Sequence, residues 1–258
     1  MADFIVALEP LGIALAGGVF PALLWLWFWL KEDYKSPEPT GLIALCFAGG
    51  MLVICLVFPV EKFVVTVLPS ILDTLRAFNT EQLFIFLPPE KIQTILLAGV
   101  EETAKYAVAF FIVFQSRHFD EPIDAVIYLI TAALGFAAVE NTLYLLKDIT
   151  SHEGVLYAAT NTNLRFLGST VIHTISSAIV GLTVAFSFYY ARSWKIITTT
   201  IGIISATLLH AYFNLSIMEV NGTADILAVF SRYWIGIVGI IILLELVKRL
   251  KPQPVTTP

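Results

Sequence analysis

Residues 122–146 read PIDAVIYLITAALGFAAVENTLYLL. An α-helix rises about 1.5 Å per residue, so roughly 20 apolar residues are enough to cross the hydrocarbon core of a bilayer. This stretch exceeds that length and holds only two charged side chains, Asp124 and Glu140. It therefore predicts a transmembrane helix with one ionisable residue, Glu140, well inside it.

The rest of the chain has the same apolar character. Of its 258 residues, 58% are hydrophobic and only 14% are charged, which is far from the composition of a soluble domain. We predict an all-α, polytopic membrane bundle of about seven transmembrane helices, which forms one domain over residues 1–250. The predicted spans are residues 11–30, 40–60, 92–114, 122–146, 163–190, 194–217 and 224–247.

Two segments fall outside these spans. Residues 61–91 mix apolar side chains with charges and three prolines, which favours an interfacial amphipathic segment, with a hidden eighth span as the alternative. Residues 251–258 contain three more prolines and are predicted to be a disordered tail. The formal net charge is -5 and no basic block occurs, so we expect no nucleic-acid partner.

The distribution of lysine and arginine predicts the orientation in the membrane, because these residues favour the cytoplasmic side. If the N-terminus lies outside and the C-terminus lies in the cytoplasm, more of these lysines and arginines fall on the cytoplasmic side than on the opposite side. The cytoplasmic residues are then Lys31, Lys35, Arg117, Arg192, Lys195, Lys248, Arg249 and Lys251, and the opposite ones are Lys62, Arg76, Lys91, Lys147 and Arg232.

Several ionisable residues lie inside the predicted spans. Such a side chain near the centre of a bilayer costs from about 3 to more than about 10 kcal/mol, so each one needs a partner, a cavity or a function. The third span contains Glu101, Glu102 and Lys105 within the sequence GVEETAK. Lys105 lies one helical turn beyond the glutamates and can neutralise one of them, which leaves one carboxylate over.

The next three spans each carry a polar stripe at helical spacing. Glu140, Asn141 and Tyr144 share a face with small alanines, which is typical of close packing inside a membrane bundle. The other two stripes are Arg165, Ser169, His173 and Ser177, and Thr207, His210 and Asn214.

The depths of these residues agree. Because successive spans run in opposite directions, their distances from one membrane surface can be compared. Glu101, Glu140, His173 and His210 all fall roughly 9 to 15 Å below the same surface. We therefore expect four helices to bring acids and histidines to one level.

Acids and imidazoles in a pocket of low dielectric constant can activate water beside a polarised carbonyl. A carboxylate accepts the proton from water, and imidazoles stabilise the oxyanion that develops. The same residues could instead hold a divalent metal such as zinc, with Glu102, Glu140, His173 and His210 as candidate ligands. The residues themselves leave both chemistries open.

Four motifs between residues 92 and 217 resemble the PrsW family of intramembrane proteases. They are E-E-x-x-K at 101–105, G-F-A-x-x-E-N at 135–141, His173, and H-x-x-x-N at 210–214. The wider superfamily comprises glutamate-type membrane endopeptidases that include CAAX-processing and bacteriocin-processing enzymes. The resemblance implies an endopeptidase of the prokaryotic cell membrane that cuts membrane-anchored regulators, such as anti-sigma factors, from the extracytoplasmic side. It also implies that residues 92–217 are the catalytic four-helix core.

The resemblance also assigns roles to these residues by position. It implies that Glu101 or Glu102 is the general base, that Glu140 is a second functional acid, and that His173 and His210 are oxyanion or metal partners. It gives Asn214 a supporting role, and from their positions in the spans we also expect supporting roles for Lys105, Asn141, Tyr144 and Arg165.

Other classes of protein remain as alternatives. Acids and histidines at one depth also carry protons or ions, so a transporter or proton-relay protein is the first rival. A transporter needs a route to both membrane faces, whereas this polar level lies toward one side. A non-catalytic scaffold is the second rival, in which Lys105 forms a structural ion pair with Glu101 or Glu102 and Asn141 joins helices by a hydrogen bond.

Overall fold

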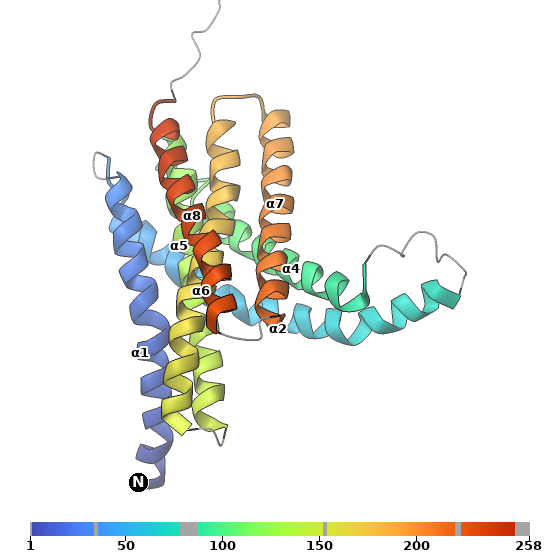
Figure 1. The fold of residues 1–258 in the computed structure, drawn as a ribbon. Helices are drawn as coiled ribbons and strands as arrows, with labels where there is room; N and C mark the ends of the chain where they lie inside the picture. The colour runs from blue at the N-terminus through green and yellow to red at the C-terminus, as the bar shows by residue number, and fades with distance from the viewer. Residues whose placement is uncertain (1, 34–35, 78–86, 152–153, 220–222, 251–258) are drawn as a thin grey trace, which may run out of the picture.

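The computed structural model describes residues 2–33, 36–77, 87–151, 154–219 and 223–250. Within these ranges all regular structure is helical (Figure 1). The helices are α1 (Ala2–Leu30), the short 3-10 helix η1 (Lys31–Asp33), α2 (Thr40–Ala77), α4 (Pro89–Ile112), α5 (Pro122–Thr150), α6 (Gly154–Phe186), α7 (Arg192–Met218) and α8 (Thr223–Val247). The prediction of an all-α polytopic bundle is confirmed.

Six of the described helices are long and apolar enough to span a membrane, and α4 is the long helix that falls short. Every 18-residue window of α4 includes Glu101, Glu102 and Lys105. These residues are at most 7% exposed, because they face neighbouring helices. The polar residues of α4 are therefore sequestered inside the bundle, where they need not meet lipid.

Helix α5 lies at the centre of the bundle. It packs against α1, α2 and α6, and 94% of the residues in its apolar window are buried. Glycine permits its close crossing with α2. A Cβ at Gly135 would overlap the backbone of Phe47, and a Cβ at Gly50 would overlap the backbone of Ala132. Small residues at such crossings let two helix backbones approach closely in membrane proteins.

Helix α2 is longer than its predicted span. It passes Val60 and ends at Ala77, so the first half of the predicted interfacial segment, residues 61–91, continues the same helix. Figure 1 shows the C-terminal end of α2 and the N-terminal end of α4 extending sideways from the bundle as an arm. Exposed apolar side chains on the arm include Phe63 and Ile71. Its location at a membrane interface stays a prediction.

Two other helices begin earlier than predicted. Both α1 and α6 start nine residues before the expected first residue, at Ala2 and Gly154. The remaining ends, apart from that of α2, agree within four residues. The predicted tail, residues 251–258, lies outside the described residues. Helix α6 contacts each of α4, α5 and α7, and these four helices contain the polar residues.

Candidate active site

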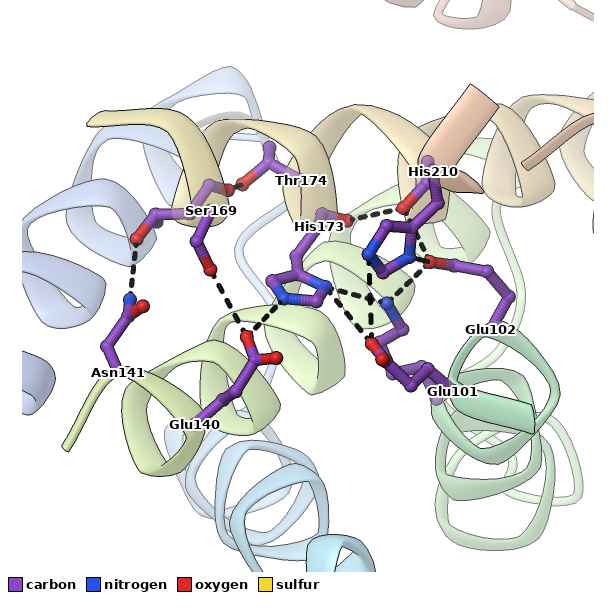
Figure 2. Close-up of polar contacts among 11 residues, drawn as sticks. Glu101, Glu102, Glu140, Asn141, Ser169, His173, Thr174 and His210 are labelled. Carbon is purple, nitrogen blue, oxygen red and sulfur yellow. Dashed lines mark hydrogen bonds and ion pairs between the residues drawn. The ribbon is translucent and has the colours of Figure 1, made fainter. Parts of the chain in front are cut away.

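Four helices bring the predicted acids and histidines to one place (Figure 2). Helix α4 contributes Glu101, Glu102 and also Lys105. Helix α5 contributes Glu140, α6 contributes His173 and α7 contributes His210. All of these residues except Glu140 are buried. The structure thus joins the residues that the sequence placed at one depth.

Glu102 is the neutralised member of the glutamate pair. Its Oε1 lies 2.6 Å from Lys105 Nζ, 2.8 Å from Ser176 Oγ and 2.8 Å from His210 Nδ1. Three donors satisfy this oxygen, and the ammonium compensates the buried negative charge. Glu102 is therefore held by its neighbours and oriented toward His210.

The partners of His173 and His210 determine which ring nitrogens carry protons. Lys105 Nζ lies 2.9 Å from His173 Nδ1, and because an ammonium only donates, this nitrogen accepts. His173 Nε2 then donates to Glu140 Oε2 at 2.8 Å. His173 therefore has one acceptor nitrogen, Nδ1. His210 Nδ1 donates to Glu102, and in the neutral ring its Nε2 would be the acceptor nitrogen.

Glu101 and Glu102 each have one buried carboxylate oxygen, Oε2, without a hydrogen-bond partner. The Oε2 of Glu101 lies 3.9 Å from two imidazole nitrogens, His173 Nδ1 and His210 Nε2. An unpaired buried carboxylate oxygen is costly unless a proton, a water molecule or a cation lies beside it. The surplus carboxylate expected from the sequence is Glu101 in the structure.

Glu140 lies at the edge of the site, with its side chain 18% exposed. Its Oε2 also accepts a hydrogen bond from Ser169 Oγ at 3.2 Å (Figure 2). The adjacent Asn141 donates to Thr170 Oγ1 at 3.1 Å, which joins α5 to α6. Asn141 therefore connects helices, as the structural alternative expected of it.

A cavity of about 820 Å³ lies beside these residues. Its polar wall includes Glu101 and Glu140, and the predicted supporting residues Tyr144 and Asn214 also line it. Apolar side chains that line it include Ile54, Phe58, Leu97, Phe213, Ile217 and Phe230. An apolar cavity with a few convergent polar groups is typical of a ligand or substrate site.

Known proteins resemble this chain over most of its length. A family model described as "PrsW family intramembrane metalloprotease" matches residues 38–244. The chain belongs to the PrsW family. Protease PrsW of Oceanobacillus iheyensis is 30% identical over 78% of this chain and 80% of its own length. Protease PrsW of Bacillus subtilis is 24% identical over 86% and 92%, respectively.

A third relative matches over a shorter stretch. Protease PrsW of Geobacillus kaustophilus is 33% identical over 135 residues, which is 52% of either protein. No solved structure is significantly similar to this chain. The resemblance to the PrsW family is confirmed, and with it the prediction of a membrane protease. Membership of this family disfavours the transporter and scaffold alternatives.

The residues fit the metal ion that the PrsW metalloprotease description implies. Glu101, His173 and His210 each offer one ligand atom, and these atoms lie within 4.8 Å of one another. Two neutral imidazoles and one carboxylate form a known ligand set of catalytic zinc, which keeps a fourth position open. The unpartnered Glu101 Oε2 is the atom that most needs such an ion.

The structure distinguishes these three residues from the predicted ligands Glu102 and Glu140. Both of those carboxylates contact the outer nitrogen of an imidazole, as carboxylates do behind metal-binding histidines. Glu101 occupies the position nearer the other nitrogen of each imidazole. A metal there requires Lys105 Nζ to leave His173 Nδ1, which it contacts at 2.9 Å.

Sequence reasoning missed Ser176 and Glu61 and did not reach the surroundings of Arg165. The polar stripe included Ser177, but Ser176 contacts Glu102, while Ser177 Oγ is buried without a hydrogen-bond partner. Either serine lies about one helical turn from His173, so spacing alone does not separate them. Glu61 lines the same cavity and would have been found by extending α2 past its predicted end. The side chain of Arg165 lies outside the described part of α6.

Proposed function

We propose that this chain hydrolyses a peptide bond of a membrane-anchored protein, such as an anti-sigma factor or a similar regulator, at the site formed by Glu101, His173 and His210. The main support for this proposal is the buried Glu101 Oε2, which has no hydrogen-bond partner and lies 3.9 Å from one ring nitrogen of each histidine. The apolar wall of the adjoining cavity suits a substrate that arrives as a transmembrane segment.

Glu101, His173 and His210 would hold a divalent metal such as zinc. Bound there, the ion would lower the pKa of a water molecule and polarise the scissile carbonyl. Glu140 faces the cavity and contacts His173 Nε2. We assign it the transfer of a proton from the attacking water to the leaving amine.

Glu102 and Lys105 have positioning roles in this proposal. Glu102 accepts a hydrogen bond from His210 Nδ1, which turns the other ring nitrogen of His210, Nε2, toward Glu101. Lys105 stabilises the charge of Glu102 at 2.6 Å. These contacts hold the imidazole in one tautomer and one orientation, which a metal ligand or an oxyanion partner needs.

The site lies nearer one end of the bundle. Glu140 is ten residues from the end of α5 at Thr150 and eighteen from its start at Pro122, or about 15 Å and about 27 Å along the axis. The start of α5 lies at the lysine- and arginine-rich end of the sequence pattern, which favours the cytoplasm. We therefore place the N-terminus outside, the C-terminus in the cytoplasm and the site toward the extracytoplasmic face.

A cleavage assay in nanodiscs tests this function. A panel of single-span membrane proteins is incubated with wild type, Glu101→Gln and His210→Ala, each with and without a chelator, and bound zinc is measured by mass spectrometry. We expect wild type to cut a substrate and to carry zinc, and both variants to lose at least about 100-fold in rate and most of the metal. Glu90→Gln, an exposed acid on the same helix, is the matched control.

The outcomes separate the parts of the proposal. Folded Glu101→Gln that cuts as fast as wild type would remove Glu101 from the site. Wild type that cuts without zinc and ignores the chelator would retain the site but exclude the metal. In that case Glu101 would act directly as the base toward water.

A further inference from the structure

Three acidic residues meet at the end of the bundle opposite the active site. Asp33 ends η1, Glu38 lies in the connection before α2, and Asp124 lies in the first turn of α5. One carboxylate oxygen from each lies within 4.8 Å of the other two. Asp33 is 6% exposed and Asp124 is 1% exposed. We refer to Asp33, Glu38 and Asp124 as the acidic trio.

Two members of the acidic trio accept hydrogen bonds, whereas one carboxylate oxygen of the third has no partner. Asp124 Oδ2 accepts the backbone N–H groups of Asp120 at 3.0 Å and Glu121 at 2.8 Å. Glu38 Oε2 accepts the hydroxyl of Tyr128. Asp33 Oδ2 is buried and has no hydrogen-bond partner. A buried carboxylate oxygen in this state carries a desolvation cost that its neighbours do not offset.

The charge of the acidic trio also lacks a dedicated counter-charge among the described residues. Lys248 is close enough to act on Asp33. Its Nζ, however, contacts Glu32 at 2.9 Å and Glu245 at 2.7 Å, so two other acids already share it. Three carboxylates lie close together, and one of their oxygens has no hydrogen-bond partner. Such a group needs either protons or a cation to offset its negative charge.

We propose that the acidic trio binds a divalent cation. Carboxylate oxygens from three separate segments are the ligands that calcium and magnesium prefer, with water completing the shell. The cation would connect the turn after α1, the segment before α2 and the start of α5, and it would supply Asp33 Oδ2 with a partner. Its role would be to fix how α1 and α2 meet the central helix.

This site is separate from the active site. Asp124 and Glu140 lie sixteen residues apart on α5, which corresponds to about 24 Å along the helix axis. The ligand types differ as well, because the acidic trio offers only oxygen while the active site offers two imidazole nitrogens. Calcium, magnesium and terbium(III), which replaces calcium, therefore select the trio over a zinc-type site.

Titration of the full chain with calcium, magnesium and terbium(III) in nanodiscs tests the proposal. The background carries Glu101→Gln, which removes the active-site carboxylate, and all samples are first treated with chelator. We expect saturable binding of one cation, a rise of at least about 3 °C in melting temperature, and terbium emission excited through Tyr128, whose hydroxyl contacts Glu38.

Two substitutions and one control decide the outcome. Asp33→Asn and the milder Glu38→Gln should each weaken binding at least tenfold and abolish the rise in melting temperature. Glu32→Gln, which removes a neighbouring acid outside the trio, should leave both unchanged. The proposal is overturned if calcium and magnesium do not bind the background, or if Asp33→Asn and Glu38→Gln bind as tightly as the Glu32→Gln control.

Discussion

Glu101 and Glu102 are adjacent identical residues with different surroundings. Glu102 lies among three donors that include Lys105, whereas Glu101 Oε2 lies in a gap between two imidazole nitrogens. One step along the helix thus places one carboxylate against an ammonium group and the next between two imidazoles. In a medium of low dielectric constant the charge of Glu101 is therefore more costly to bury than that of Glu102, unless a proton or a cation lies beside it.

Glutamine at these two positions should affect stability in opposite ways. In metal-free protein, Glu102→Gln leaves Lys105 as an uncompensated buried charge, and we expect a loss of about 3–5 kcal/mol in unfolding free energy. Glu101→Gln removes a buried charge whose Oε2 has no hydrogen-bond partner, so it should be as stable as wild type or more stable. Thermal melts in detergent with chelator measure both. Glu102→Gln combined with Lys105→Met should recover much of the loss; equal melting temperatures for the two single variants would contradict this assignment.

Ser176 and Ser177 provide a test matched to within one residue. Ser176→Ala removes a donor to Glu102 Oε1, and a hydrogen bond to a charged group contributes about 1.5–3 kcal/mol. We expect cleavage to fall about tenfold or more, because Glu102 then holds His210 less firmly. Ser177→Ala should remain within about twofold of wild type, since its hydroxyl has no partner. Steady-state cleavage rates decide, and equal effects of the two substitutions would exclude Ser176 from the positioning network.

The sequence predicted which residues form the site better than it predicted their contacts. Glu101, Glu140, His173 and His210 could be found because an ionisable residue inside a span is costly wherever its helix lies. Their partners depend on helix rotation and tilt. A difference of one residue rotates a side chain by about 100°, and that difference separates Ser176 from Ser177 and Glu101 from Glu102.

At the scale of helices, the crossing of α2 and α5 fixes the wall of the site. Gly135 of α5 lies against the backbone of Phe47, and Phe136 next to it packs edge-on against His173 with ring centroids 5.3 Å apart. The same stretch of α5 therefore supports both the crossing and the imidazole. A change in helix spacing here would reach the active site directly.

Alanine at Gly135 should be destabilising because its Cβ would meet backbone atoms that have no rotamer to change. We expect a loss of about 1–3 kcal/mol, the usual cost of overpacking. Gly239 of α8 has open space around it, so Gly239→Ala should be neutral or stabilising by up to about 1 kcal/mol. Denaturant unfolding in detergent compares them. A Gly135→Ala protein as stable as Gly239→Ala would mean that the helices separate without cost.

The C-terminal end of α2 shows where a prediction from hydropathy fails. The predicted span stops at Val60 because Glu61 and Lys62 follow it. Backbone hydrogen bonding in a helix does not require apolar side chains, however, and α2 continues to Ala77. Glu61 is consequently a helical residue that faces the cavity. Helix α2 also packs against α4, and such a contact between two helices cannot be read from residues 61–77 alone.

At the scale of the whole molecule, the two polar clusters lie toward opposite ends of α5. The candidate active-site residues are nearer Thr150, and the acidic trio lies at the start of the helix, near Asp124. The charge pattern assigns the Asp124 end to the cytoplasm. Chemistry on the substrate and the proposed cation site would then be exposed to different compartments.

Cysteine labelling in intact bacterial cells tests this orientation. Cysteine is placed at Ser151, just after α5, or at Ala191, between α6 and α7; both positions are exposed and lie at opposite ends of α6. The native exposed Cys55 is replaced by serine. A membrane-impermeant maleimide should label Ser151→Cys in whole cells and Ala191→Cys only after lysis, because the lysine- and arginine-rich loops remain in the cytoplasm. The reverse pattern would place the Glu140 end of α5 in the cytoplasm, and the substrate would then have to be cut from that side.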